Sequence, residues 1–90
     1  MDITTTLTER GNRYGSFIDH AQVTQDLKKL ALHHLEIRQK YLSPDQKEAL
    51  EMIFHKIGRI INGDPDYADS WHDIAGYAQL IADRLNGTIR

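Results

Sequence analysis

The sequence predicts an all-α protein in which three main helices and a short N-terminal arm form an antiparallel bundle. Apolar residues recur every three or four positions along most of the chain, as they do on one side of an α-helix. Residues 43–46 (Ser-Pro-Asp-Gln) have the composition of a helix start, and residues 62–65 (Asn-Gly-Asp-Pro) that of a break between helices. No stretch alternates polar and apolar residues as a β-strand does. With 90 residues, 40% hydrophobic and 27% charged, the chain is expected to fold as one domain over residues 1–90.

Residues 1–16 are expected to form a mixed arm with one or two helical turns. Leu7, Tyr14 and Phe17 would pack this arm on the bundle. The alternative is a polar lid over a ligand, made by Glu9, Arg10, Arg13 and Tyr14.

A long helix is predicted over residues 17–42, which contain neither glycine nor proline. Its apolar seam has the alternating four- and three-residue spacing of a heptad repeat and consists of Val23, Leu27, Leu30, His34, Ile37 and Tyr41. This spacing predicts packing at a shallow angle against another helix. Since His34 lies in the seam, it is expected to be a hydrogen-bonded core residue.

Two more helices are predicted over residues 44–62 and 66–86. Ser43 at the N-cap, Pro44 at the first helical position and Gln46 two residues later form a capping box. Gly63 and Gly87 suit the two helix ends. Three helices alone would leave apolar side chains uncovered, so a homo-oligomer, a dimer or tetramer, is expected to complete a four-helix bundle.

Composition argues against several classes of protein. The net charge is −2 and no basic run exceeds two residues, so nucleic-acid binding is not expected. The chain has no cysteine, which excludes disulfides and thiolate metal sites and fits a cytoplasmic protein. No apolar stretch approaches the roughly 20 residues that span a bilayer, and the first residues do not resemble a signal peptide. We therefore expect a cytoplasmic protein without a membrane partner.

Acidic residues occur in pairs at one-turn spacing on the second and third helices. Glu48 and Glu51 form one pair, and Asp69 and Asp73 form the other. If the two helices are antiparallel, the four carboxylates would meet and bind Mg²⁺, which prefers oxygen ligands. The alternative is that both pairs are solvated helix surface, which is common in soluble proteins.

Basic residues near these carboxylates predict a phosphate-bearing substrate. Lys56 and Arg59 would contact phosphate oxygens. His55 or His72 would transfer a proton or donate a hydrogen bond to the substrate.

The acidic pattern resembles that of a known enzyme superfamily. Glu48-Ala-Leu-Glu51 and Asp69-Ser-Trp-His-Asp73 are similar to the Glu-x-x-Glu and Glu-x-x-Asp motifs of MazG-like all-α nucleotide pyrophosphohydrolases. The chain also resembles a small phage and prophage protein family that is distantly related to that superfamily. The residues that carry this second resemblance are 9–15 with Phe17, then 48–65, then 69–77.

The resemblance implies helical subunits that dimerise or tetramerise, with a Mg²⁺-dependent site between them that cleaves a nucleoside triphosphate to a monophosphate and pyrophosphate. Glu48 and Glu51 match the first motif and Asp73 matches the final aspartate, so with Asp69 they are the expected metal-binding and catalytic residues. Asp69 departs from the motif, because it is shorter than glutamate and lies four residues before Asp73 rather than three. The expected substrate-binding residues are Lys56, Arg59, His72 and Tyr14, of which Tyr14 would contact a base.

That departure leaves a second function open. The chain would then be a non-catalytic phage accessory protein in the cytoplasm of a bacterial host, where it binds a nucleotide or blocks a host protein. A structural or assembly role is the third alternative.

Overall fold

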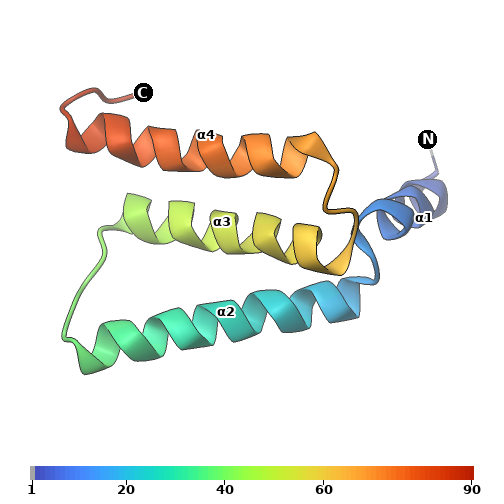
Figure 1. The fold of residues 1–90 in the computed structure, drawn as a ribbon, viewed down its shortest axis with the longest axis horizontal. Helices are drawn as coiled ribbons and strands as arrows, with labels where there is room; N and C mark the ends of the chain where they lie inside the picture. Colours follow the sequence, from blue (N-terminus) through green and yellow to red (C-terminus); the bar gives the residue numbers. More distant parts are fainter. Residues whose placement is uncertain (1) are drawn as a thin grey trace.

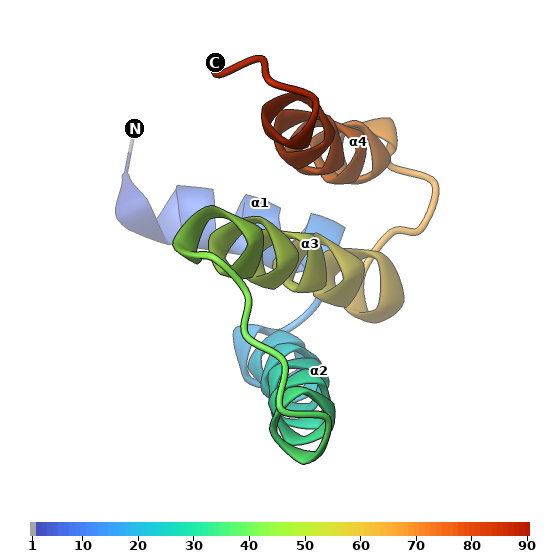
Figure 2. The ribbon, with the colours of Figure 1, turned by 90° about the vertical axis from the view of Figure 1, so that its left-hand side faces the viewer.

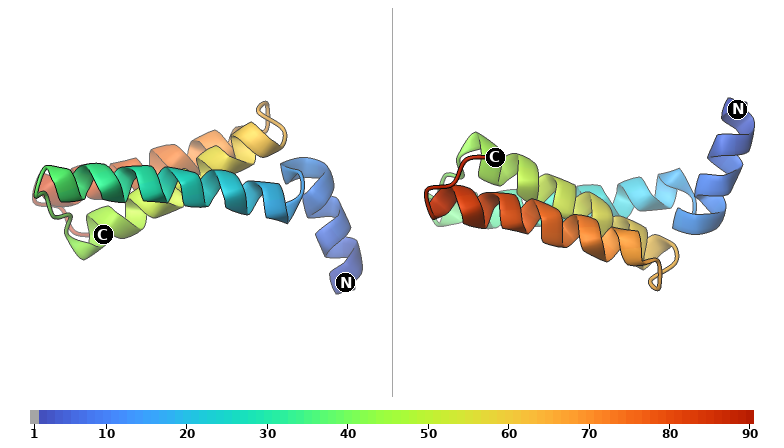
Figure 3. Two further views of the ribbon diagram at one scale, coloured as in Figure 1. Left: turned by 90° about the horizontal axis from the view of Figure 1, so that it is seen from below. Right: turned by 90° about the horizontal axis from the view of Figure 1, so that it is seen from above.

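The computed structural model describes residues 2–90, which form four helices: α1 (Ile3–Tyr14), α2 (Phe17–Ile37), α3 (Pro44–Asn62) and α4 (Ala68–Leu85). Helices α2, α3 and α4 run antiparallel in one layer with α3 in the middle (Figures 1 and 2). Helix α1 leaves the end of this layer at an angle (Figure 3). No strand occurs in the described part of the chain, so the all-α prediction is confirmed.

The N-terminal arm is a complete helix, and the prediction of a mixed segment is corrected. Asp2 caps α1, because its side chain accepts a hydrogen bond from the backbone N–H of Thr4 at 3.3 Å. The layer thus has three helices as predicted, and a fourth helix precedes it.

Two predicted helix boundaries also move by two residues or more. Helix α2 ends at Ile37 rather than at residue 42, because Gln39 adopts a φ of 52° and Lys40 donates its N–H back to the carbonyl of Leu35. Helix α4 begins at Ala68 rather than at residue 66, because Asp66 donates its N–H to the Asp64 carboxylate at 2.9 Å in a turn.

The start of α3 has the capping box that the sequence predicts. The backbone N–H of Ser43 donates to Gln46 Oε1 at 3.0 Å, and Pro44 occupies the first helical position. Arg84, from the last turn of α4, donates to Asp45 and to the hydroxyl of Ser43 at 2.7–2.9 Å. This bidentate contact lowers the pKa of Asp45 and joins the end of α4 to the start of α3.

Helix α3 has a neighbour on each side. His55 and Gly58 face α2, whereas Asp45 and Lys56 bond to α4. No Cα atoms of α2 (17–37) and α4 (68–85), both fully described, come within 8 Å of each other. Among residues 2–90, Ala49 is the one buried apolar residue, so a single chain has no closed core.

The layer leaves one apolar side of α3 open. Leu50, Ile57 and Ile61 follow one another at seven and four residues, so they share a third side between the two flanks. Ile61 is 63% exposed, and on α2 the seam residues Leu30 and Ile37 are each 59% exposed. We call the side chains of Leu50, Ile57 and Ile61 the open face of α3; Ile61 is exposed, and the other two are half-buried.

The predicted role of His34 is wrong, because His34 is exposed rather than part of a core. Its ring nitrogen Nδ1 lies 2.7 Å from Nη1 of Arg38. Within one chain the C-terminal part of the seam, which includes His34, Leu30 and Ile37, is therefore left uncovered. None of the helices in the described chain has both the length and the apolar character needed to cross a membrane.

Candidate functional site

The four predicted carboxylates lie apart in one chain. Two ion pairs fix how α3 and α4 align: Lys56 Nζ lies 2.9 Å from Asp73 Oδ2, and Arg84 Nε lies 2.7 Å from Asp45 Oδ2. Lys56 is therefore level with residue 73, and residue 45 with residue 84. At 1.5 Å per residue this alignment places Glu48 and Glu51 roughly 7–18 Å along the helix axes from the aspartates of α4.

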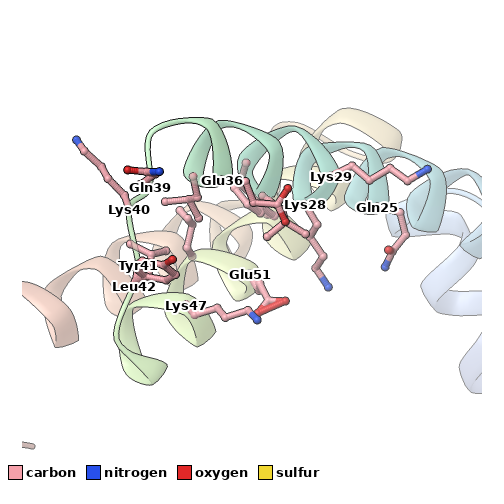
Figure 4. A pocket seen from close by; sticks show the side chains of 15 residues that line it. Gln25, Lys28, Lys29, Glu36, Gln39, Lys40, Tyr41, Leu42, Lys47 and Glu51 are labelled. Carbon is pink, nitrogen blue, oxygen red and sulfur yellow. The ribbon is translucent and has the colours of Figure 1, made fainter.

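Glu51 also faces the wrong neighbour for such a site. It lines a groove of about 620 Å³ between α2 and α3, whereas the aspartates belong to α4 on the other side of α3. Figure 4 shows Glu51 and Lys47 side by side at the edge of this groove, with Lys28 reaching toward them from α2. Residues 2–90 contain no group of three or more histidine, aspartate or glutamate side chains that could hold a metal ion. The quartet within one chain does not fit Mg²⁺, so a Mg²⁺ site made of these residues would need a second copy.

Lys56 and Asp73 bind each other. The Lys56 side chain is only 11% exposed, and its ammonium group contacts the half-exposed Asp73 carboxylate. Asp69 accepts a hydrogen bond from the hydroxyl of Tyr67 at 2.7 Å. His72, predicted to bind substrate, is exposed on α4. The Lys56–Asp73 ion pair joins α3 to α4, whereas the Tyr67–Asp69 hydrogen bond lies within the start of α4. Neither contact gathers the predicted residues around one ligand.

Tyr14 and Arg59 do come together, at the junction of α1 and α3. The Arg59 guanidinium lies 4.2 Å from the centre of the Tyr14 ring. Arg13 lies 4.2 Å from the centre of the Tyr67 ring and donates to its hydroxyl at 3.1 Å. The two tyrosine rings meet edge to face, with centres 6.3 Å apart. Cation–π contacts of this kind order the guanidinium groups.

A polar pocket of about 620 Å³ opens beside these four side chains. We call it the arginine pocket, and its lining includes Thr6, Glu9, Arg10, Arg13, Arg59 and Asp64. Elsewhere Arg84 and Arg90 form ion pairs with carboxylates. Across the described residues, no ion pair involves the three arginines of the pocket. Their guanidinium groups are therefore available to an anion.

The turn after α3 builds the pocket. Asn62 Nδ2 donates to the carbonyls of Tyr14 and Ser16, each at 2.9 Å. The N–H of Asp64 donates to the carbonyl of Arg13 at 2.8 Å. A side chain on Gly63 would collide with the backbone of residues 13 and 14, so only glycine allows α1 to approach this closely.

Some residues that the sequence singled out line this pocket. Tyr14 and Arg59 were predicted to bind substrate, and Arg10 and Arg13 belonged to the alternative in which the arm covers a ligand. What the sequence missed is that residues 62–64 bond to the end of α1 and bring these side chains together. The sequence signal that could have revealed this site is the stretch Arg-Gly-Asn-Arg at residues 10–13, which has an arginine at each end.

A histidine pair between α2 and α3, in which His20 is buried and His55 is half-buried, was not predicted. His20 Nε2 lies 3.2 Å from His55 Nδ1, and His20 is 8% exposed. Gly58 lies against His20 and Thr24, which leaves room for the pair. Burial lowers the pKa of His55 to about 4, with help from the positive charge of Arg59, and the same two causes lower the pKa of His20.

Acid is expected to destabilise the fold through this pair. Because the folded pKa of His55 is about 4 against 6.5 for the free side chain, the neutral ring stabilises the fold above pH 6.5, and this contribution is lost as pH falls toward 4. We expect about 1–2 kcal/mol, after allowing for partial exposure. Urea unfolding at a series of pH values measures it.

The control for the acid effect is a histidine outside the pair. His55→Gln should flatten the pH dependence, whereas His72→Gln, on an exposed residue, should keep it. A wild-type stability that does not change between pH 7 and pH 4.5 would contradict the burial of the pair.

Comparison with known protein families gives a match over nearly all of the structure. A family described as "Domain of unknown function (DUF6378)" matches residues 3–85. The chain belongs to this family. The matched region runs from the start of α1 to the end of α4, so the arginine pocket and the histidine pair both lie inside the DUF6378 domain. Searches of curated proteins and of solved structures give no match.

Proposed function

We propose that this DUF6378 domain binds a phosphate-bearing small molecule, with a nucleotide as the preferred ligand, in the arginine pocket. The observation that carries the proposal is that Arg10, Arg13 and Arg59 line one pocket with no ion pair to any described residue. Guanidinium groups present planar pairs of N–H donors that match phosphate oxygens.

The contacts around the pocket favour binding. Arg59 and Arg13 already lie on the rings of Tyr14 and Tyr67, so these side chains lose little further conformational freedom when an anion binds. A volume of about 620 Å³ is typical of small-molecule sites. Asn12 and Glu9 also line the pocket and offer hydrogen-bond donors and acceptors to the polar edge of a base. These groups favour a nucleotide over inorganic phosphate.

The working unit in this proposal is a homo-oligomer. The open face of α3 and the exposed seam of α2 leave large apolar side chains in water, among them Ile61 at 63% exposure. A second copy that covers them would form the four-helix bundle expected from the sequence. This assembly is the feature that favours a second candidate function.

The second candidate is Mg²⁺-dependent pyrophosphohydrolysis of a nucleoside triphosphate between subunits, as the MazG-like resemblance implies. Glu48, Glu51 and Asp69 form no ion pair with any residue in the described range, so they remain available to a site that two chains share. Release of pyrophosphate in the presence of Mg²⁺, lost in Glu51→Gln, would support it. Nucleotide binding without any pyrophosphate release would favour the non-catalytic alternative.

Arg59→Gln is expected to weaken nucleotide binding by roughly 10- to 100-fold, because it removes a charged hydrogen bond to phosphate. Isothermal titration calorimetry with adenosine and deoxyguanosine triphosphates measures the affinity. The matched control is Arg90→Gln, whose parent residue pairs with Asp83 outside the pocket and is expected to leave affinity unchanged. Equal losses in the two variants, or no binding by the wild type at millimolar nucleotide, would contradict the proposal.

A further inference from the structure

Helix α1 contacts the rest of the chain through its C-terminal end. The carbonyls of Arg13 and Tyr14 accept hydrogen bonds from Asp64 and Asn62, and Arg13 contacts Tyr67. Residues 3–12 form no hydrogen bond or ion pair with another described helix, and α1 has no buried residue in the described structure. Figure 3 shows the N-terminal end of α1 pointing away from the layer.

The arginine pocket lies in the angle between α1 and α3. Arg10 and Arg13 line it from α1, and Arg59 lines it from α3. Arg10 precedes Arg13 by one helical turn, which separates their backbones by about 4.5 Å along the axis. Arg13 is bonded to Tyr67, whereas no hydrogen bond, ion pair or ring contact of Arg10 to another described residue is present. An anion that reaches Arg10 and Arg59 together would join the free part of α1 to α3.

We infer that the ligand carries a chain of two or three phosphates, and that this chain joins Arg10 to Arg59 and thereby fixes α1 against the layer. The inference rests on the proposed function, because it concerns the same pocket. Arginines one turn apart on α1 and a third on α3 suit successive phosphate groups, because a phosphate chain presents more oxygens and more negative charge along its length than a single phosphate does. The carboxylates of Glu9 and Asp64 would repel surplus phosphate and face the sugar or base instead.

Fixing α1 has a measurable consequence. Amide hydrogens of residues 3–12 exchange when the free part of the helix opens, and a second point of attachment makes that opening rarer. Exchange should therefore slow in α1 when the phosphate chain binds. Residues of α3 that already lie between two helices should change much less.

The test is hydrogen–deuterium exchange on the full chain with adenosine mono-, di- and triphosphate, each at a concentration that calorimetry shows to be saturating. We expect exchange in residues 3–12 to slow by roughly tenfold with the di- and triphosphate and to change little with the monophosphate. Arg10→Gln should remove this protection while part of the affinity remains, because Arg13 and Arg59 still bind. Arginine and glutamine have similar helix propensities, so the free α1 is unchanged. Arg90→Gln is the matched control and should keep the protection.

The outcomes separate the two proposals. Binding of the triphosphate without slower exchange in α1 would overturn this inference and leave the proposed function intact. Equal protection by the monophosphate would also overturn it, since no phosphate chain would be needed. If no nucleotide binds, the proposed function and this inference both fail.

Discussion

Ile61→Asp is expected to convert the proposed homo-oligomer to single chains and to weaken association by about 2–4 kcal/mol, or roughly 30- to 1,000-fold in dissociation constant. Ile61 lies on the open face of α3 and is 63% exposed in one chain, so the substitution removes little packing inside the subunit. In an assembly the same side chain would be buried, and an aspartate there would lose its hydration without gaining a partner. Association should therefore suffer far more than the fold of the monomer.

Sedimentation velocity over a range of concentrations measures this effect. Ile89→Asp is the matched control, because Ile89 is 87% exposed and follows the last helix. It should assemble as the wild type does. A wild type that sediments as a monomer at all concentrations would contradict the expected homo-oligomer, and an assembled Ile61→Asp would show that the subunits meet elsewhere.

Gly58→Ala is expected to destabilise the fold by about 1–2 kcal/mol, although alanine is the better helix former. A Cβ at this position would lie 2.7 Å from Thr24 Oγ1 and 3.0 Å from the ring of His20. Both neighbours are buried, so relief of the contact requires α2 to move away from α3. Such a movement would also open the histidine pair.

The control for this prediction is Gly76→Ala in the middle of α4. Apart from its chain neighbours and the backbone of its own helix, a Cβ there has no described atom within 4 Å, so the substitution should stabilise the fold by about 1 kcal/mol through helix propensity alone. Urea denaturation of both variants gives the comparison. Equal stabilisation by the two substitutions would show that α2 does not pack closely on Gly58.

Local sequence signals predicted the helices of the layer well, because helix starts and ends depend on nearby residues. Ser43, Pro44 and Gln46 form their capping box within a few residues, so no tertiary information was needed. The end of α2 was misplaced because it depends on the left-handed backbone of Gln39, which glutamine rarely adopts. The arm was misjudged because Asp2 was not recognised as a helix cap.

The candidate site was harder to predict because it depends on how helices align. Spacing shows that Glu48 and Glu51 share one side of a helix, but not which residues of α4 lie beside them. The ion pairs of Lys56 with Asp73 and of Arg84 with Asp45 set that alignment, and they separate the acidic pairs. The His20–His55 contact joins residues 35 positions apart, which no local pattern shows.

The central position of α3 has a consequence for how the chain folds. Since α2 and α4 each contact α3 and never each other, the layer consists of two hairpins that share one helix. The stability of the layer therefore depends on contacts between neighbouring helices alone, as it does in repeat proteins. Folding can begin in either hairpin and spread through α3, with mostly local loop closures and a correspondingly fast rate. The same arrangement leads us to expect that α4 can detach while α2 stays paired with α3, so local opening need not unfold the whole chain.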